Sequence, residues 1–167
     1  MPSPDEISDE AAEIAAEVAH LAKQRQLTIA VAESLTGGKV ACHLAAAPDA
    51  SQWFRGGVVA YSSEVKHDVL GVPAGPVVSE ASAAAMAAGV ARLVGADIAV
   101  ATTGVGGPDP QEGQPPGTVW LAVAAAGDTT SHLESFDGDP ALVLDRTVVR
   151  ALRLLHEAVA GPDPRSQ

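Results

Sequence analysis

The sequence has few aromatic residues, a single cysteine and few positive charges. Only 3% of its 167 residues are aromatic, and Cys42 alone excludes a disulfide framework and a cysteine-rich zinc site. Ten basic residues stand against 21 acidic ones, and this net charge of −11 argues against a nucleic-acid-binding protein, which needs a basic face. No apolar run approaches the roughly 18 residues of a membrane span, and the acidic N-terminus is unlike a signal peptide.

Small apolar residues dominate what is present. The chain contains 33 alanines and is 47% hydrophobic, which is too apolar for a disordered protein. We therefore expect one cytoplasmic globular domain over residues 1–160, followed by a frayed tail over residues 161–167. Its core must be built mainly from Ala, Val and Leu, so its helices and strands should pack closely.

The hydrophobic spacing predicts helices that alternate with short strands. Ser3-Pro4-Asp5-Glu6 offers a capping box at the start of the first helix, whose apolar face continues to Leu21. The other helices are expected at 39–47, 62–70 and 79–94, and the strands at 27–32, 57–61, 97–103, 118–126 and 129–136. A final helix is expected after the last strand, with Val148, Leu152, Leu155 and Val159 on one face. The last two strands should form a hairpin with a Gly127-Asp128 turn.

The order of these elements indicates an α/β domain with a mixed, partly parallel sheet and helices on both faces. The strand at 97–103 is apolar without alternation, which is typical of a central strand covered on both sides. In such sheets ligands bind beyond the carboxyl ends of the strands. Three segments of this chain follow strand ends and carry reactive or very small residues.

The first segment is Glu33-Ser34-Leu35-Thr36-Gly37-Gly38. Ser34 is expected at a turn from strand to helix, where the N–H groups of residues 36–38 would attract an anion or oxyanion. Ordinary helix capping explains the same residues, and spacing alone favours it. The segment lacks the G-x-S-x-G pattern of hydrolases.

The second segment, residues 61–66, contains the only tyrosine, Tyr61, and one of three lysines, Lys66. A desolvated lysine can lose its proton near neutral pH, so Lys66 is a candidate general base. A solvated helix start, with Glu64 and Lys66 in water, is the alternative that the pattern alone favours. Ser63 and Lys66 match the S-x-x-K pattern of penicillin-recognising enzymes, but the partner motifs of that pattern are missing.

The third segment is the glycine- and proline-rich stretch from Gly104 to Gly117, which follows Thr102-Thr103. A loop of this length is uncommon unless it is functional, and glycines are costly to order. We expect it to act as a lid or ligand cradle.

Other candidates for chemistry are weaker. The five histidines show no metal-ligand spacing, so no metal is expected. Cys42 lies in an alanine-rich helix and is expected to be a small core residue. Trp53-Phe54 is expected to anchor a helix onto the sheet, and together with small-residue helix faces it is a candidate oligomer interface.

Taken together, these segments resemble the CinA C-terminal domain family, which includes stand-alone nicotinamide-nucleotide amidohydrolases. The resemblance rests on VAESLTGG at 31–38, FRGGVVAYSSEVKHDVLGV at 54–72 and ATTGVGGPDP…PPGTVWLAV at 101–123, in family order. It covers about Ile14 to Leu155. It implies a three-layer α/β/α sandwich, usually a homo-oligomer, without a metal or other cofactor. Because no segment of the sequence resembles the additional N-terminal domain of full-length CinA proteins, we expect the stand-alone form of the family.

The resemblance implies deamidation of nicotinamide mononucleotide, a step of pyridine-nucleotide salvage. It assigns Ser34 as the nucleophile and Tyr61 and Lys66 as its helpers. We expect backbone N–H groups near Gly37, Gly38 or Gly104 to stabilise the oxyanion. The substrate-binding residues expected on this basis are Glu33, Thr36, Gly37, Gly38, Thr103, Gly104, Gly106 and Arg146.

The chain departs from the family pattern at the start of the last helix. Many members carry Gly-Asp-Arg and a second arginine there, whereas this chain has Gly138-Asp139-Pro140 and Leu144. Arg146 and Arg150 lie nearby but out of register. Two alternatives therefore stay open: a non-catalytic module that binds a nucleotide or a partner, and an amidase for another small carboxamide.

Overall fold

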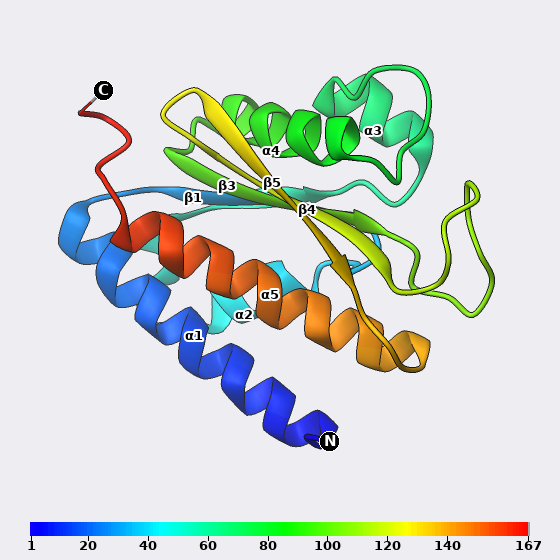
Figure 1. Ribbon diagram of the computed structural model, residues 1–167. Helices are drawn as coiled ribbons and strands as arrows, with labels where there is room; N and C mark the ends of the chain where they lie inside the picture. Colours follow the sequence, from blue (N-terminus) through cyan, green and yellow to red (C-terminus); the bar gives the residue numbers. More distant parts are fainter. Residues whose placement is uncertain (167) are drawn as a thin grey trace.

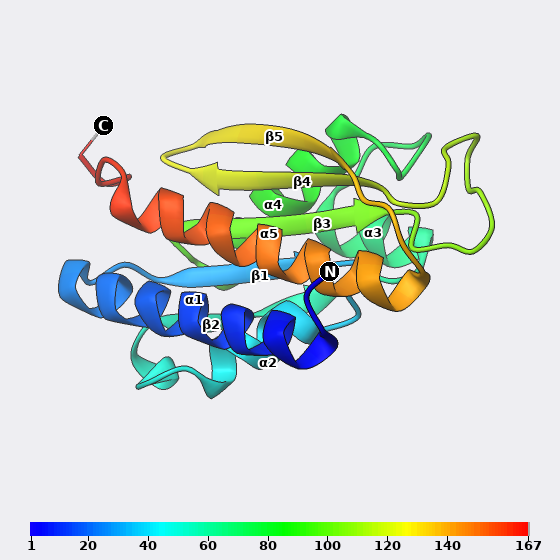
Figure 2. The same cartoon turned by 60° about the horizontal axis from the view of Figure 1, so that its bottom comes forward.

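Five strands form one mixed sheet in the computed structural model, which describes residues 1–166 (Figure 1). The spatial order is β2-β1-β3-β4-β5, as Figure 2 shows. The strands β1 (Ile29–Glu33), β2 (Phe54–Val59) and β3 (Ile98–Gly104) are parallel, whereas β4 (Thr118–Ala125) and β5 (Asp128–Ser135) continue the sheet antiparallel. The central place of β3 confirms the interpretation of its unbroken apolar run.

Helices cover both faces of this sheet and complete the three-layer α/β/α sandwich (Figure 1). One face carries α1 (Pro4–Arg25), α2 (Lys39–Ala46) and α5 (Pro140–Ala160), and the other carries α3 (Ser63–Leu70) and α4 (Glu80–Val94). The predicted capping box is present: the Glu6 N–H donates to Ser3 Oγ and the Ser3 N–H donates to the Glu6 carboxylate. The predicted start of the first helix is thus confirmed.

The two faces of the sheet have different cores. The core under α1, α2 and α5 contains large side chains such as Leu121, Leu152 and Ile98. The core under α3 and α4 is built mostly from alanines together with Leu70 and Met86. Because alanine is short, α3 and α4 approach very closely, and a Cβ added to Gly89 would lie only 2.2 Å from the Leu70 carbonyl oxygen.

The strand expected at 57–61 starts three residues earlier and ends two residues earlier, at Phe54–Val59, because the glycine pair belongs inside the strand. The register against β1 shifts beside Arg55, where Ile29 faces Phe54 and Ala30 faces Gly56. Gly56 has a φ of +112°, and a Cβ on Gly57 would meet the Val31 carbonyl oxygen at 2.3 Å. The glycines therefore permit a bulge and a close strand contact rather than marking a strand end.

The hairpin turn is also displaced by one residue. Ala125 pairs with Asp128, so the turn residues are Ala126 and Gly127 rather than Gly127 and Asp128. Their φ values of +56° and +79° are those of a type I′ turn, which matches the twist of the flanking strands.

Two predictions about single residues have different outcomes. Cys42 is exposed on α2, so its assignment to the core was wrong: it lies on the helix face opposite to the buried Val40 and Leu44. Trp53 is buried at 1% exposure and donates from Nε1 to the Pro48 carbonyl just after α2. It thereby ties the end of that helix to the sheet and is not available as an interface residue.

The described part of the expected tail is hydrogen-bonded to the end of α1. Arg165 donates to the carbonyl oxygens of Arg25 and Gln26, and Arg25 donates to that of Gly161. Gln167 lies outside the described residues. Within residues 1–166, none of the helices combines the length and the apolar character needed to cross a membrane.

Candidate active site

A cavity of about 330 Å³ lies beyond the carboxyl ends of β1 and β3. This is the end of the sheet from which the loop between β3 and β4 projects in Figure 1. All three segments singled out in the sequence contribute to it. The cavity is lined by Ser34, Leu35, Tyr61, Ser63, Lys66, Val77, Val78, Thr103, Gly104, Val105, Gly106, Gly107, Asp109, Gln111, Pro140 and Leu144.

Ser34 stands directly after β1, in the turn that leads to α2. Its N–H donates to the Thr102 carbonyl on β3 and its own carbonyl accepts from the Gly37 N–H, so both backbone groups are held. The residue is 7% exposed and lines the cavity, and its hydroxyl makes no hydrogen bond within the described chain. Ser34 therefore does not cap α2, and its Oγ is free to meet a ligand.

Lys66 is buried at 2% exposure on the first turn of α3, so the solvated alternative was wrong for this residue. Its Nζ donates to the Tyr61 carbonyl at 3.2 Å, and no carboxylate among the described residues lies within ion-pair distance. Burial lowers the pKa of Lys66, because a charged ammonium loses its hydration, and Glu112 partly opposes that effect. The group is therefore suited to act as a neutral base.

Tyr61 lines the same cavity but projects outward. It is 72% exposed, and within residues 1–166 the contact that it makes with Lys66 is through its backbone carbonyl. The carbonyl orients the lysine, and the phenol stands at the cavity mouth. The catalytic role expected for Tyr61 stays a prediction.

Of the oxyanion donors expected at Gly37, Gly38 or Gly104, only the Gly104 N–H belongs to a residue that lines the cavity. The Gly37 N–H is used by the Ser34 carbonyl, and Gly38 does not line the cavity. Leu35 and Gly106 do line it, and within the described chain neither of their N–H groups has an acceptor. Leu35 directly follows the nucleophile candidate, and in α/β-hydrolases the residue at that position supplies an oxyanion donor.

Four predicted binding residues lie behind the cavity wall. The Glu33 carboxylate, 1% exposed, accepts from the N–H groups of Val40 and Ala41 at 2.9 and 3.0 Å. It therefore occupies the N-terminus of α2, which was expected to attract an anion or oxyanion. The other three shape the turn: Thr36, bonded to Thr102 through its hydroxyl, and Gly37 and Gly38, which have positive φ.

The loop between β3 and β4 contributes the wall that the sequence predicted. Gly104, Gly106 and Thr103 all line the cavity. The Thr103 hydroxyl donates to the Val77 carbonyl at 2.7 Å, so it supports the opposite wall and is not free for a ligand.

Comparison with known proteins places this architecture in a family. The sequence matches the CinA C-terminal domain family over residues 11–159. This chain belongs to the CinA C-terminal domain family. A CinA-like protein of Frankia casuarinae is 46% identical over 143 residues, which are 83% of this chain and 33% of that protein. A putative competence-damage inducible protein of Geobacillus kaustophilus is 44% identical over 145 residues, 83% of this chain and 35% of the relative. The chain thus spans about a third of the length of these curated relatives.

Solved CinA-superfamily structures have the same fold. The competence damage-inducible protein A of Klebsiella pneumoniae superposes with a TM-score of 0.86 at 40% identity, over 90% of this chain and 97% of that one. A CinA-superfamily protein of Escherichia coli has a TM-score of 0.86 at 34% identity, over 93% of both chains. The α/β fold and the family assignment are therefore established. The names of these related proteins describe competence and damage induction rather than a reaction.

In this CinA C-terminal domain, Arg146 lies away from the cavity. Its guanidinium donates to the Asp137 carbonyl at 2.9 Å and contacts Met1, in a separate groove between α1 and α5. Pro140 and Leu144 line the cavity at the start of α5 instead. The prediction that Arg146 binds substrate at this site is thus not supported by its position.

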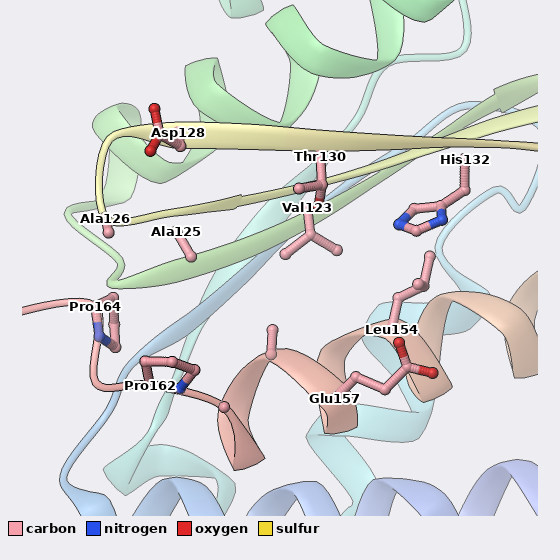
Figure 3. Close-up of a pocket in the computed structure, with 12 residues that line it drawn as sticks. Val123, Ala125, Ala126, Asp128, Thr130, His132, Leu154, Glu157, Pro162 and Pro164 are labelled. Atoms are coloured by element: carbon pink, nitrogen blue, oxygen red, sulfur yellow. The ribbon is translucent and has the colours of Figure 1, made fainter.

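A second, larger groove of about 440 Å³ lies at the opposite end of the sheet (Figure 3). It runs between the β4–β5 hairpin and the C-terminal part of α5, and its polar side chains include Asp128, His132 and Glu157. No serine, cysteine or lysine lines it, and within residues 1–166 no cluster of three metal-ligating side chains exists. The cavity beside Ser34 and Lys66 is therefore the candidate active site of this domain.

Proposed function

We propose that this CinA C-terminal domain is an amidohydrolase in which Ser34 is the nucleophile and Lys66 the general base. One observation carries the proposal: an unpartnered serine hydroxyl and a buried lysine of lowered pKa line the same cavity at the carboxyl ends of parallel strands. A lysine held in this way provides the base that a serine needs to attack an amide.

The reaction follows from these groups. Neutral Lys66 takes the proton from Ser34 Oγ as the oxygen bonds to the carboxamide carbon, and the N–H groups of Leu35 and Gly106 receive the developing oxyanion. The C–N bond then breaks, and the lysine ammonium returns the proton to the leaving nitrogen, which departs as ammonia. Water, deprotonated by Lys66, hydrolyses the acyl-enzyme to a carboxylate and restores Ser34.

The substrate implied by the family resemblance is nicotinamide mononucleotide, which would become nicotinate mononucleotide. The cavity, at about 330 Å³, lies within the range of roughly 300–1,000 Å³ that is usual for small-molecule sites. Its mixed lining of Leu35, Val77, Val78 and polar groups suits a flat aromatic carboxamide.

A second candidate is an uncharged carboxamide without a phosphate, and the charge of the cavity favours it. Among the lining residues Lys66 is the one cation, and it faces a site that also contains Asp109. The neighbouring helix N-termini are occupied by carboxylates of the chain itself, Glu33 on α2 and Asp139 on α5. A phosphate dianion would meet few donors there and several like charges.

Ammonia release decides between these possibilities. Purified protein is incubated with nicotinamide mononucleotide, its riboside and free nicotinamide, and we expect ammonia from at least one of them. Ser34→Ala should lower the rate by about 10³-fold or more, whereas Ser131→Ala, on β5 outside the cavity, should leave it unchanged. Preference for free nicotinamide would select the uncharged substrate, whereas preference for the riboside, whose pyridinium ring is cationic, would show only that the phosphate is not needed. No ammonia from any compound, with retained nucleotide binding by calorimetry, would instead support a non-catalytic binding module.

A further inference from the structure

We infer that Glu112 is a positioning residue for the proposed Ser34–Lys66 reaction, because its carboxylate fastens the glycine-rich loop to the opposite wall of the cavity. This inference rests on the proposed function. It concerns a residue that neither lines the cavity nor stood out in the sequence.

The contact is made by both carboxylate oxygens. Glu112 Oε1 accepts from the Val77 N–H at 3.0 Å, and Oε2 accepts from the N–H groups of Val77 and Val78 at 3.1 and 3.0 Å. Val77 and Val78 are 3% and 4% exposed and line the cavity directly. Hydrogen bonds to an ionised acceptor are about twice as strong as neutral ones, so this contact holds a wall segment that belongs to no helix or strand.

Val77 is held from both sides. Its N–H binds the loop tip through Glu112, and its carbonyl accepts from the Thr103 hydroxyl at the end of β3. The loop thus leaves the sheet after Gly104, passes the cavity and contacts at Glu112 the same wall residue that Thr103 binds. An enclosed, pre-organised cavity results, as proton transfer between fixed groups requires.

The backbone conformation of Glu112 shows that its side chain is the reason for this residue type. Gln111 and Gln114 exchange two backbone hydrogen bonds, so Glu112 and Gly113 form a two-residue turn with φ values of +52° and +74°. Asn, Asp and Gly are the residues that such turns prefer. A glutamate accepts an unfavourable φ here, and the compensating interaction is the one with Val77 and Val78.

Glu112 also faces Lys66 electrostatically, since its negative charge raises the lysine pKa against the effect of burial. The titratable groups on the elements around Lys66 are Tyr61, Glu64, His67, Asp68, Glu80, Arg92, Asp109 and Glu112. Of these, Glu112 is the group whose charge opposes the desolvation of Lys66. The same carboxylate therefore shapes the cavity and keeps the base from losing its proton affinity entirely.

The test is the pH dependence of kcat/KM for ammonia release by wild type, Glu112→Gln and Glu112→Ala. Removing the charge should lower the Lys66 pKa, so the acid limb of the profile moves to lower pH in both variants. That displacement should shrink at high salt, because Glu112 is an exposed residue. Glu112→Ala, which also loses the wall contact, should lower kcat/KM by about 10- to 100-fold. Glu13→Gln, an exposed change of equal charge on α1, should match wild type.

Amide hydrogen exchange at Val77 and Val78 gives a readout that does not need turnover. We expect faster exchange in Glu112→Ala than in wild type, with the rest of the sheet unchanged. Unchanged profiles and unchanged exchange in both variants would overturn the inference. If kcat/KM falls in the variants but the acid limb of the pH profile stays at the wild-type pH, Glu112 has a structural role only, and the inference is wrong. A wild type that releases no ammonia would refute the proposed function itself, and the inference with it, whatever the exchange shows.

Discussion

Lys66 is the residue whose observed environment differs most from the one that its sequence neighbours predict. Its neighbours Glu64 and His67 are polar and suggest a solvated turn, yet the lysine side chain is buried and lines the cavity. Burial lowers its pKa, which turns a surface-type residue into a candidate base. An arginine could not take this role, because its guanidinium stays protonated at any pH at which proteins are folded.

We therefore expect Lys66→Arg to lower kcat by about 10²- to 10⁴-fold, the usual contribution of a general base. The wild-type rate should rise with pH through the lowered pKa of Lys66, whereas the residual rate of the variant should not follow that limb. Rates of ammonia release across pH provide the measurement. Lys39→Arg, which alters a surface ion pair with Asp145, is the matched control. Full activity of Lys66→Arg would show that a neutral lysine is not needed.

Among the helices, α3 and α4 lie very close together because Gly89 has no side chain and the residues around it are small. Gly89 on α4 lies against the Leu70 carbonyl at the end of α3, and the core around it is mostly alanine. This close contact places α3, and with it Lys66, against the body of the domain. A glycine in a helix is normally a weakness, but here it permits the approach of two backbones.

Gly89→Ala should consequently destabilise the protein by about 1–3 kcal/mol, as overpacked sites do, although the same change in an open helix stabilises by about 1 kcal/mol. The reason is that the new Cβ would lie 2.2 Å from a carbonyl oxygen, so one helix must move. Urea unfolding measures the difference in free energy. A variant as stable as wild type, or more stable, would show that the two helices are not in this contact.

In the whole molecule, the cavity is formed by segments that lie far apart in the sequence. Its walls come from the turn after β1, the start of α3, the segment at 77–78, the loop after β3 and the start of α5. A buried lysine in this setting has a cost for the folded state, since its charged form loses hydration that the unfolded chain retains. The difference in stability between wild type and a neutral variant should therefore change with pH.

Below its lowered folded-state pKa, Lys66 is charged in the folded protein, and the buried charge destabilises the fold by its full amount. This destabilisation is relieved as the pH rises from that pKa toward the ordinary value of 10.5. Lys66→Met should thus be more stable than wild type below the folded-state pKa of Lys66, and the gap should close as the pH rises from that pKa toward 10.5. Melting temperatures of both proteins across this range test the expectation. If the two melting temperatures differ by the same amount at every pH, the lysine is not desolvated in the folded protein.

The sequence alone determined the features that depend on neighbouring residues. The capping box of Ser3 and Glu6, the apolar run of β3 and the strand-to-loop transitions at Ser34 and Thr103 are local, because hydrogen bonds and side-chain periodicity act over a few residues. Those signals were enough for the α/β order of elements and for the three segments that meet at the cavity. The family motifs added the roles of Ser34, Tyr61 and Lys66, which stay proposals.

Which side chains face the cavity, and which are bound to other parts of the chain, became known only from the three-dimensional structure. Glu33 and Arg146 are bound to other parts of the chain, Cys42 points to solvent, and Glu112 reaches across to Val77. These outcomes depend on contacts between residues far apart in the chain, as Glu112 and Val77 are. No local pattern contains them, because burial and hydrogen-bond partners arise only when the layers pack.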